Sequence, residues 1–428
     1  MNEIIQDNLH LLYPKYNNVN HNINTEIFRG KLYCSLLKDF SKSCLLHLNE
    51  KIFSHKKTTN RTLTNLLSSW FFTLYQYYDF SDDCFFPSNY IHFETLEQTL
   101  EDYCSIYPME DNKDKIKLII SDLADNYNKL LIELKSYIII NTNISVIKKI
   151  VYQERQYDSH LQNIPFYKFF IDTETYNIHF GKSIKIYNKL NNIINNIIIP
   201  ISQYNLMESR YKQFDNKISI DYIIWIILYR YQLLSSNNNQ LAVLENILEL
   251  MKKDYDLSCE SFASAINGSL NIFCSIYYDI EKYFGSVGSF FNIVPIKGTY
   301  SFNPPYQFDI INNGINRIIY HLNNNSELAF IITIPIWDIE GKEYMANNLT
   351  ENNNNIIKYD DFNIMNVIKT SKYFKGLRMI SKDNFTYFDH NFYLYKNKTI
   401  QNTYVILMST MDITIDCINN YDFFTVNS

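Results

Sequence analysis

Strand-like and helix-like segments alternate along the second half of the chain. Runs rich in β-branched and aromatic residues recur there, and between them the apolar residues stand at helical spacing. Helices are predicted near 263–278 and 308–322, and the strand-like runs read "CESFAS", "FFNIVPI", "LAFIITIPIW" and "TYVILMS". Such alternation is typical of an α/β fold in which helices cover a mainly parallel sheet.

The first part of the chain has a different spacing of apolar residues. Residues 25–150 carry apolar side chains at i, i+3 and i+4, which predicts several helices. From about residue 151 the pattern changes, because "PFYKFFIDTETYNIHFGKSIKIY" predicts a β-hairpin, and helical patterns follow at 185–199 and 219–253. We therefore expect a helical domain at 1–150 and an α/β core at 151–428.

The composition excludes several classes of protein. The 428 residues are 46% hydrophobic and 16% aromatic, as in a folded chain, and no stretch approaches the roughly eighteen consecutive apolar residues that a membrane span needs. The formal net charge of -6 is not that of a protein that coats nucleic acid non-specifically. The abundance of Asn, Ile, Lys, Tyr and Phe is typical of translation from an AT-rich genome.

The cysteines and the N-terminus predict where the protein works. Seven cysteines are dispersed along the chain, without a C-x-x-C pair or a Cys/His cluster at zinc spacing. An odd and scattered set is typical of reduced thiols in an intracellular protein. The N-terminus has no basic segment followed by an apolar one, so no secretory leader is expected. We expect a protein of the cytoplasm or nucleus, with no metal site and no membrane association.

A Pro-Pro pair interrupts the alternating region in "SFNPPYQF". Two consecutive prolines fix the backbone, remove two N–H donors and leave carbonyl groups free. The pattern before the pair is strand-like and the pattern after it is helix-like. The quartet from Asn303 to Tyr306 is therefore predicted to follow the C-terminal end of a strand, where ligands bind in open α/β sheets.

The quartet suits methyl transfer to an adenine amine. The lone pair of that nitrogen is delocalised into the ring, and a site that accepts both N–H bonds makes the nitrogen a better nucleophile. The Asn303 side chain supplies one acceptor and the Pro304 carbonyl supplies the other, while Pro305 keeps them in fixed relation and the ring of Tyr306 stacks on the base. Attack on the methyl group of a sulfonium donor then needs no metal. A plain turn is the alternative interpretation of these four residues.

The surroundings of the quartet resemble a known family. "CESFASAIN", "YFGSVGSFFNIVPIKGTYSFNPPY", "FIITIPIWD" and "QNTYVIL", in this order, resemble the phosphorylated-CTD-interacting-factor family of cap-specific mRNA (adenosine-N6) methyltransferases. The resemblance extends from about Ile224 to the C-terminus. It implies a Rossmann-like, S-adenosylmethionine-dependent methyltransferase core behind an N-terminal helical domain. It also implies an mRNA (2′-O-methyladenosine-N6-)-methyltransferase whose substrate is the adenosine next to the 7-methylguanosine cap.

The resemblance assigns roles residue by residue. It makes Asn303, Pro304, Pro305 and Tyr306 catalytic. It places near the cofactor the residues Glu260, Phe262, Ala263, Ser264, Asn267, Gly285 and Ser286. It suggests substrate contacts by Trp337, Asp338, Arg210 and Arg230. An ordinary strand-to-helix connection is the alternative for the turn at 260–267, and a core tryptophan is the alternative for Trp337.

Partners and alternative functions follow from the same resemblance. The expected partner is capped mRNA that begins with adenosine. A WW module needs two tryptophans about twenty residues apart, whereas Trp occurs only at 70, 225 and 337, so binding to the RNA polymerase II tail is not expected. A virus or protist that caps its own transcripts fits the AT-rich composition. The alternatives are a methyltransferase for adenine in DNA or internal RNA, and a catalytically silent scaffold that binds RNA or a partner.

Overall fold

The chain forms two compact units in the computed structural model. The first contains Asn238–Ser428 together with Met1–Tyr13 and Asp158–Leu161, and the second contains Pro14–Tyr157 and Gln162–Asn237. The structure describes residues 9–11, 22–48, 59–77, 83–87, 93–105, 112–140, 147–152, 166–171, 193–194, 197–213, 218–234, 240–336, 364–390, 396–399 and 402–423. The main division of the chain thus falls near residue 238, whereas the sequence texture predicts a domain boundary at 150.

The first unit, here called the α/β unit, is built around a five-stranded sheet in the order β10-β13-β9-β8-β6. The pairs β6–β8 and β8–β9 are parallel, and the pairs β9–β13 and β13–β10 are antiparallel. The sheet is therefore mixed, whereas the sequence predicts a mainly parallel one. Its strands are β6 (Leu257–Glu260), β8 (Lys297–Phe302), β9 (Glu327–Pro335), β10 (Phe374–Ile380) and β13 (Thr403–Ser409).

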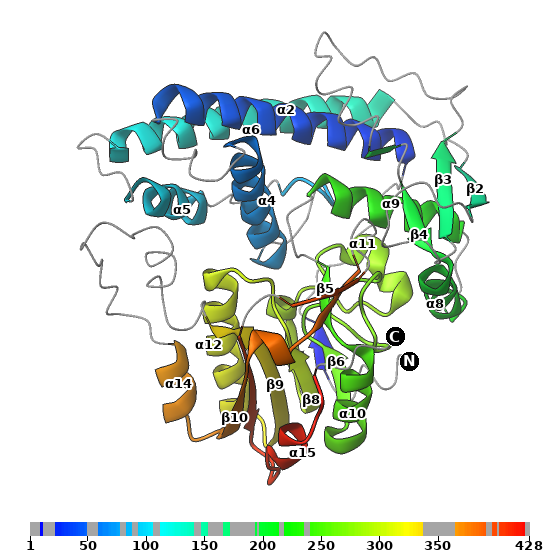
Figure 1. Cartoon of the computed structure of the whole chain (residues 1–428). Helices are drawn as coiled ribbons and strands as arrows, with labels where there is room; N and C mark the ends of the chain where they lie inside the picture. The colour runs from blue at the N-terminus through cyan, green and yellow to red at the C-terminus, as the bar shows by residue number, and fades with distance from the viewer. Residues whose placement is uncertain are drawn as a thin grey trace. The chain divides into compact units, whose positions relative to one another are not determined.

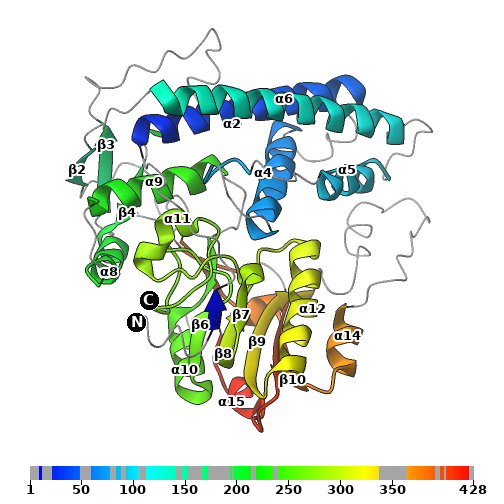
Figure 2. The ribbon, with the colours of Figure 1, turned by 180° about the vertical axis from the view of Figure 1, so that it is seen from behind.

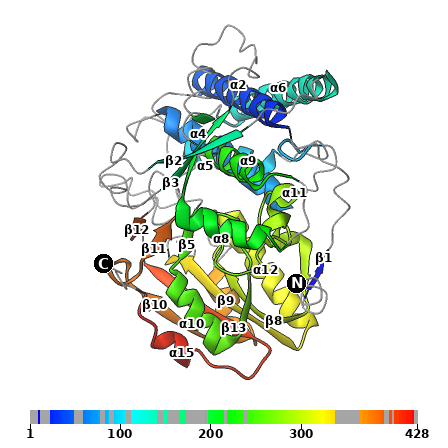
Figure 3. The same ribbon diagram turned by 90° about the vertical axis from the view of Figure 1, so that its right-hand side faces the viewer.

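Helices cover both faces of this sheet (Figures 1 and 3). Successive side chains of a strand point to opposite faces. Phe330 and Ile332 of β9 accordingly join one apolar cluster with α12 and α14, while Ile331 joins the other with α10 and α15. The four helices are α10 (Glu245–Tyr255), α12 (Phe308–Asn324), α14 (Ile364–Thr370) and α15 (Asp416–Asn419).

Smaller elements complete the α/β unit. Strand β5 pairs with β11 and β11 with β12 in a second, three-stranded sheet, and β1 pairs with β7. One short helix, α11, precedes β7 in the chain. These elements are β1 (Leu9–Leu11), β5 (Leu241–Val243), α11 (Tyr278–Glu281), β7 (Ile293–Pro295), β11 (Tyr387–Asp389) and β12 (Lys396–Lys398).

Several predictions for this region are confirmed and one is wrong. The helix predicted near 308–322 and the strands predicted in "LAFIITIPIW" and "TYVILMS" are present as α12, β9 and β13. The helix predicted near 263–278 is absent, because residues 261–277 form an irregular loop. Side chains that bond backbone N–H groups within this loop take the place of a helical hydrogen-bond ladder.

The second unit, here called the helical unit, contains the helices predicted for 25–150. Helices α2 and α6 lie side by side (Figure 1). A small antiparallel sheet, β2-β3-β4, also belongs to this unit, and the partner strand predicted for β3 near 183–187 lies outside the described residues. The elements are α2 (Ile23–His47), α4 (Thr59–Tyr77), α5 (Glu94–Ser105), α6 (Asn112–Ile140), β2 (Ile147–Tyr152), β3 (Phe166–Ile171), β4 (Ile198–Pro200), α8 (Ile201–Tyr211) and α9 (Ile220–Leu233). Among the helices that the structure describes, none combines the length and apolar character required to cross a bilayer.

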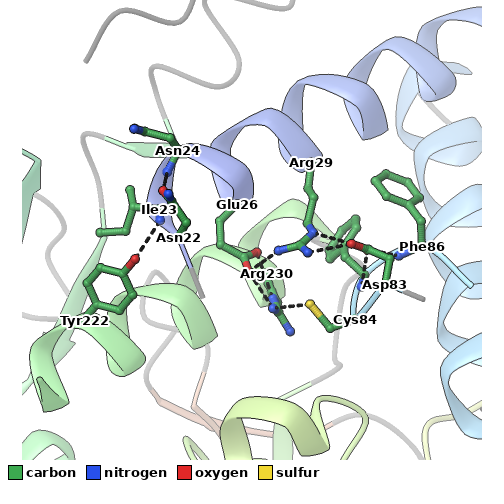
Figure 4. A network of polar contacts seen from close by, with 11 residues as sticks. Asn22, Ile23, Asn24, Glu26, Arg29, Asp83, Cys84, Phe86, Tyr222 and Arg230 are labelled. Atoms are coloured by element: carbon green, nitrogen blue, oxygen red, sulfur yellow. Dashed lines mark hydrogen bonds and ion pairs between the residues drawn. The ribbon is translucent and has the colours of Figure 1, made fainter. Parts of the chain in front are cut away.

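A buried network of charges joins distant parts of the helical unit (Figure 4). Glu26 of α2 and Arg230 of α9 are both fully buried, and Nε and Nη2 of Arg230 donate to the two carboxylate oxygens of Glu26 at 3.0 and 2.6 Å. Arg29 donates from Nη1 to Glu26 at 2.7 Å, and from Nε and Nη2 to Asp83 at 3.1 and 2.6 Å. Two carboxylates thus balance two guanidinium groups away from water, which is the condition under which buried charge is tolerated.

The substitution Glu26→Gln should destabilise the protein strongly. It keeps the shape of the side chain but leaves the two guanidinium groups with one carboxylate, and a broken buried pair typically costs about 3–5 kcal/mol of the free energy of unfolding. Urea denaturation measures the loss. The matched control is Glu208→Gln, because Glu208 forms a solvent-exposed pair with Lys212 at 2.9 Å and such pairs contribute about 0–1 kcal/mol. Equal stability losses in the two variants would contradict a central role for the network.

Candidate active site

Three parallel strands of the α/β unit end at the same edge of the sheet. Strands β6, β8 and β9 lie next to one another (Figure 2), and their last residues are Glu260, Phe302 and Pro335. Because parallel strands end on the same side, the loops that follow them converge there. The quartet from Asn303 to Tyr306 follows the middle strand of the three, as predicted from the sequence.

Two hydrogen-bond acceptors of the quartet have no donor among the residues that the structure describes. Oδ1 of Asn303 is shielded from water and accepts no hydrogen bond from any residue that the structure describes. The carbonyl of Pro304 likewise accepts none from the described backbone, whereas the next carbonyl, that of Pro305, accepts from the N–H of Gln307 at 2.7 Å. Adjacent acceptors without donors are what a site for an amino group requires.

Packing on both sides fixes the position of the quartet. Before it, the Phe302 ring is fully buried in the apolar cluster beneath α12. Gly314 lets α12 approach this ring, since a Cβ at that position would lie 2.3 Å from Cζ of Phe302. After the quartet, α12 begins at Phe308, and the Gln307 carbonyl accepts from the N–H of Ile311 at 3.1 Å. The two acceptors are therefore held by a buried strand on one side and a helix on the other.

Tyr306 is half-buried and packs against the second sheet. Its ring meets that of Tyr387 on β11 edge to face, with the ring centroids 6.0 Å apart. Burial raises the pKa of Tyr387 to about 12, so this phenol stays neutral at physiological pH. The contact makes Tyr306 part of the packing around the loop, in addition to any contact with a base.

The turn predicted to bind the cofactor is a compact loop after β6. Oε1 of Glu260 accepts from the N–H groups of Ser269 and Leu270, both at 2.6 Å. Oδ1 of Asn267 accepts from the Ser264 N–H at 2.6 Å, and the Ser264 hydroxyl lies 3.0 Å from the same oxygen. Glu260, Ser264 and Asn267 are all buried, so their side chains shape the loop from inside. Phe262 and Ala263 are only partly buried and are the members of this set that remain accessible.

The loops after β6 and β8 are directly connected. The N–H of Ser261, the first residue after β6, donates to the carbonyl of Ser301 in β8 at 2.8 Å. The ring of Phe262 meets the ring of Phe302 at a centroid distance of 5.2 Å, with the planes almost perpendicular. The predicted donor turn and the predicted catalytic quartet therefore lie side by side.

Gly285 and Ser286 reach the same region through Phe273. A backbone bridge joins Phe273 to Glu260 on one side and to Ser286 on the other. Gly285 has φ of 105°, and a Cβ there would lie 2.0 Å from the Asn271 carbonyl oxygen, so this glycine is required by packing within the loop. The Ser286 and Ser275 hydroxyls are 2.7 Å apart. The sequence interpretation, in which the glycine allows a ligand to approach, gains no support from this geometry.

The structure does not test the substrate contacts predicted for Trp337, Asp338, Arg210 and Arg230. Trp337 and Asp338 lie outside the described residues. Arg210 on α8 and Arg230 on α9 belong to the helical unit, where both are buried. The pair between Arg230 and Glu26 would have to open before Arg230 could bind a nucleotide. No three His, Cys, Asp or Glu side chains gather as a metal site within the described part of the chain.

Sequence reasoning missed the contribution of the second sheet. Gln240 precedes β5, and its Oε1 accepts from the Ser264 hydroxyl at 2.9 Å, while Tyr387 of β11 contacts Tyr306. The short strand β5, "LAV", lies within the range 219–253, for which the apolar spacing predicts helix. The sequence therefore does not predict this strand. One small sheet thus contacts both the predicted donor turn and the quartet.

Comparison with known proteins finds a matching family model and similar proteins in mouse and human. Residues 202–372 match a family model described as "Phosphorylated CTD interacting factor 1 WW domain". The chain is also 28% identical over 121 residues to proteins of Mus musculus and Homo sapiens named mRNA (2'-O-methyladenosine-N(6)-)-methyltransferase. This stretch is 27% of the chain and 17% of each relative, so it covers less than a fifth of the relatives' length. Because the description of the family model names a WW domain, the expected absence of that module gains no support from the match and stays a prediction.

Replacement of Tyr306 separates its packing from any contact with substrate. Tyr306→Phe keeps the ring against Tyr387 and should leave the free energy of unfolding within about 0.5 kcal/mol. Tyr306→Ala removes a half-buried ring and its edge-to-face contact, and should lower that free energy by about 2 kcal/mol. Urea denaturation measures both changes. Tyr320→Ala on α12 is the control, since Tyr320 is exposed; a Tyr306→Ala variant as stable as this control would show that the ring does not support the loop.

Proposed function

We propose that this chain, which the match over residues 202–372 links to the phosphorylated CTD interacting factor 1 family, is an adenine-N6 methyltransferase that uses S-adenosylmethionine. The proposed substrate is the 2′-O-methyladenosine next to the cap of an mRNA, as the names of the mouse and human relatives suggest. The proposal concerns this chain's own site, because the match covers only a small part of those relatives.

The observation that carries the proposal is the pair of unused acceptors at Asn303 and Pro304. An exocyclic amino group has two N–H bonds, and Oδ1 of Asn303 with the Pro304 carbonyl offers one acceptor to each. Hydrogen bonds to both N–H groups increase the nucleophilicity of the nitrogen at the moment of attack. A desolvated acceptor without a donor also costs about 1–3 kcal/mol, and binding of the amine would recover that free energy. Preorganised polar groups of this kind are the main source of catalysis in many enzymes.

We place the methyl donor at the loop after β6. S-adenosylmethionine supplies an electrophilic methyl group on a sulfonium. The half-exposed Phe262 and Ala263 would contact it, on a loop whose shape Glu260, Ser264 and Asn267 maintain and beside which Gly285 and Ser286 lie. The hydrogen bond from Ser261 to Ser301 keeps this loop next to the quartet, as transfer between donor and acceptor requires.

The strand arrangement is compatible with a Rossmann-like methyltransferase core. Three adjacent parallel strands, one of which leads through a helix to the next, form the type of sheet whose C-terminal edge binds ligands. Helices cover both of its faces. The antiparallel β13 between β9 and β10 makes the sheet mixed, which doubly wound folds tolerate near an edge.

Two alternatives remain from the sequence. An enzyme that methylates adenine in DNA or internal RNA would use the same two acceptors and would differ only in what surrounds them. A catalytically silent scaffold would have no use for a buried Asn303 oxygen without a partner, and this observation favours an enzyme. Contacts of Trp337, Asp338, Arg210 or Arg230 with the substrate stay predictions, as do a viral or protist source and the lack of binding to the polymerase tail.

Asn303→Ala should abolish most methyl transfer while the protein stays folded. Loss of one preorganised polar contact to the reacting group typically lowers the rate about 100-fold to 1000-fold. Because Oδ1 of Asn303 bonds no described residue, the melting temperature should not fall. Single-turnover transfer of labelled methyl from S-adenosylmethionine measures the rate. Asn316→Ala, at an exposed position of α12, is the control. Near-normal turnover by Asn303→Ala would contradict the catalytic role of Asn303.

Cap dependence should distinguish the proposed substrate from the alternatives. Two RNAs that begin with adenosine and differ only in the 7-methylguanosine cap are compared, together with single-stranded DNA of the same sequence. The methylated guanine carries a positive charge and stacks well on aromatic side chains, so we expect faster methylation of the capped RNA. Equal rates on capped and uncapped RNA would favour the internal-RNA enzyme, and transfer to DNA would favour the DNA enzyme.

A further inference from the structure

Gln240 is a buried amide with one end unused. Its side chain is 6% exposed, Oε1 accepts from the Ser264 hydroxyl at 2.9 Å, and its backbone carbonyl accepts from the His390 N–H at 3.0 Å. Both the backbone and the orientation of the amide are thereby fixed. The other end of the amide, Nε2, is buried and donates to no residue that the structure describes.

A second unused group lies in the neighbouring loop. Ser261 directly follows β6, is 0% exposed, and its hydroxyl has no hydrogen-bond partner among the described residues. Its backbone N–H donates to the Ser301 carbonyl, so the residue is held against the end of β8, two residues before Asn303. Oδ1 of Asn303, two residues beyond Ser301, is the third unused group of this region.

Unused polar groups of this kind need an explanation. More than nine in ten buried polar groups in proteins have a partner, because an unpaired one loses its hydrogen bonds to water and gains nothing. The carboxylates that flank the loop, Glu260 and Glu281, accept backbone N–H bonds from Leu270 and Ala265. A ligand bound at this edge of the sheet would supply the missing partners of Gln240, Ser261 and Asn303.

We propose that Gln240 and Ser261 bind S-adenosylmethionine. This proposal rests on the proposed function and adds two residues to the donor site. Nε2 of Gln240 donates to an acceptor atom of the cofactor, and the Ser261 hydroxyl forms a second hydrogen bond to it. The cofactor offers such acceptors in its carboxylate, its ribose hydroxyls and its adenine ring. Ser264 acts through Gln240, because its hydroxyl fixes which end of the amide faces the ligand.

Ser261→Ala gives the sharpest test. A hydroxyl without a partner contributes nothing to the stability of the free protein, so its removal should leave the melting temperature unchanged or higher. If the hydroxyl binds the cofactor, the same change should weaken the affinity for S-adenosylhomocysteine, the product form of the donor, about 5-fold to 10-fold in calorimetric titration. A group with a purely structural role would not give this combination of an unchanged melting temperature and a weaker affinity.

Gln240→Glu tests the second residue. The glutamate keeps an oxygen for the Ser264 hydroxyl and nearly the same shape, but it has no N–H to donate. We expect about a tenfold weaker affinity for S-adenosylhomocysteine, measured with Gln240→Met as a second variant that is free of added charge. The matched control is Ser258→Ala on β6, whose hydroxyl already donates to the Thr299 carbonyl at 3.0 Å. This control should lower the melting temperature and leave the affinity unchanged.

The outcomes separate this inference from the proposed function. If the wild-type protein binds S-adenosylhomocysteine and both Ser261→Ala and Gln240→Met bind it equally well, the inference is overturned while the proposed function stands. Failure of the wild-type protein to bind S-adenosylmethionine or S-adenosylhomocysteine would overturn both. Titration with 5′-methylthioadenosine, which lacks the amino-acid end, locates the contact: a loss confined to S-adenosylhomocysteine assigns the residue to that end, and a loss with both ligands assigns it to the adenosine.

Discussion

Parallel pairing of β8 with β6 on one side and β9 on the other determines where the candidate site lies. The pairing brings the ends of three strands to one edge, and the hydrogen bond from Ser261 to Ser301 extends the contact with β8 into the loop that follows β6. The quartet at Asn303 and the loop after Glu260 are adjacent for this reason, although more than thirty residues separate them in the chain. The apolar clusters on both faces hold the sheet and so hold this edge.

The loop after β6 shows how polar groups are divided between structure and function. Three side chains accept hydrogen bonds from backbone N–H groups of this loop: those of Glu260, Asn267 and Glu281. These bonds give a rigid shape to a segment without regular secondary structure. Among the polar atoms without a partner in the described part of the chain, those of Ser261 and Asn303 directly follow β6 and β8, and that of Gln240 belongs to a side chain bonded to Ser264 of this loop. A loop that satisfies its own backbone internally can present its remaining polar atoms to a ligand without collapsing onto them.

Local pattern was enough to predict some parts of this structure. Proline stereochemistry, and the change in the spacing of apolar residues around the quartet, place Asn303 to Tyr306 between a strand and a helix. The apolar residues of α12, β9 and β13 recur at regular spacing, so these elements are also predicted. The helix that the sequence predicts near 263–278 is absent, because the bonds from side chain to backbone in this loop leave no mark on apolar spacing. The role of Gln240 and the burial of Arg230 depend on partners from distant segments, which a single sequence does not reveal.

The pair between Glu26 and Arg230 also limits the order in which the protein can be made. The two residues are 204 positions apart, so during synthesis helix α2 leaves the ribosome long before the guanidinium that balances Glu26 exists. Until α9 has emerged, Glu26 lacks its two hydrogen bonds from Arg230, and Arg29, which also bonds Glu26, is shared with Asp83. The helical unit therefore reaches its final packing only late in translation, and a nascent chain that stops short of Arg230 would keep α2 accessible to chaperones and proteases.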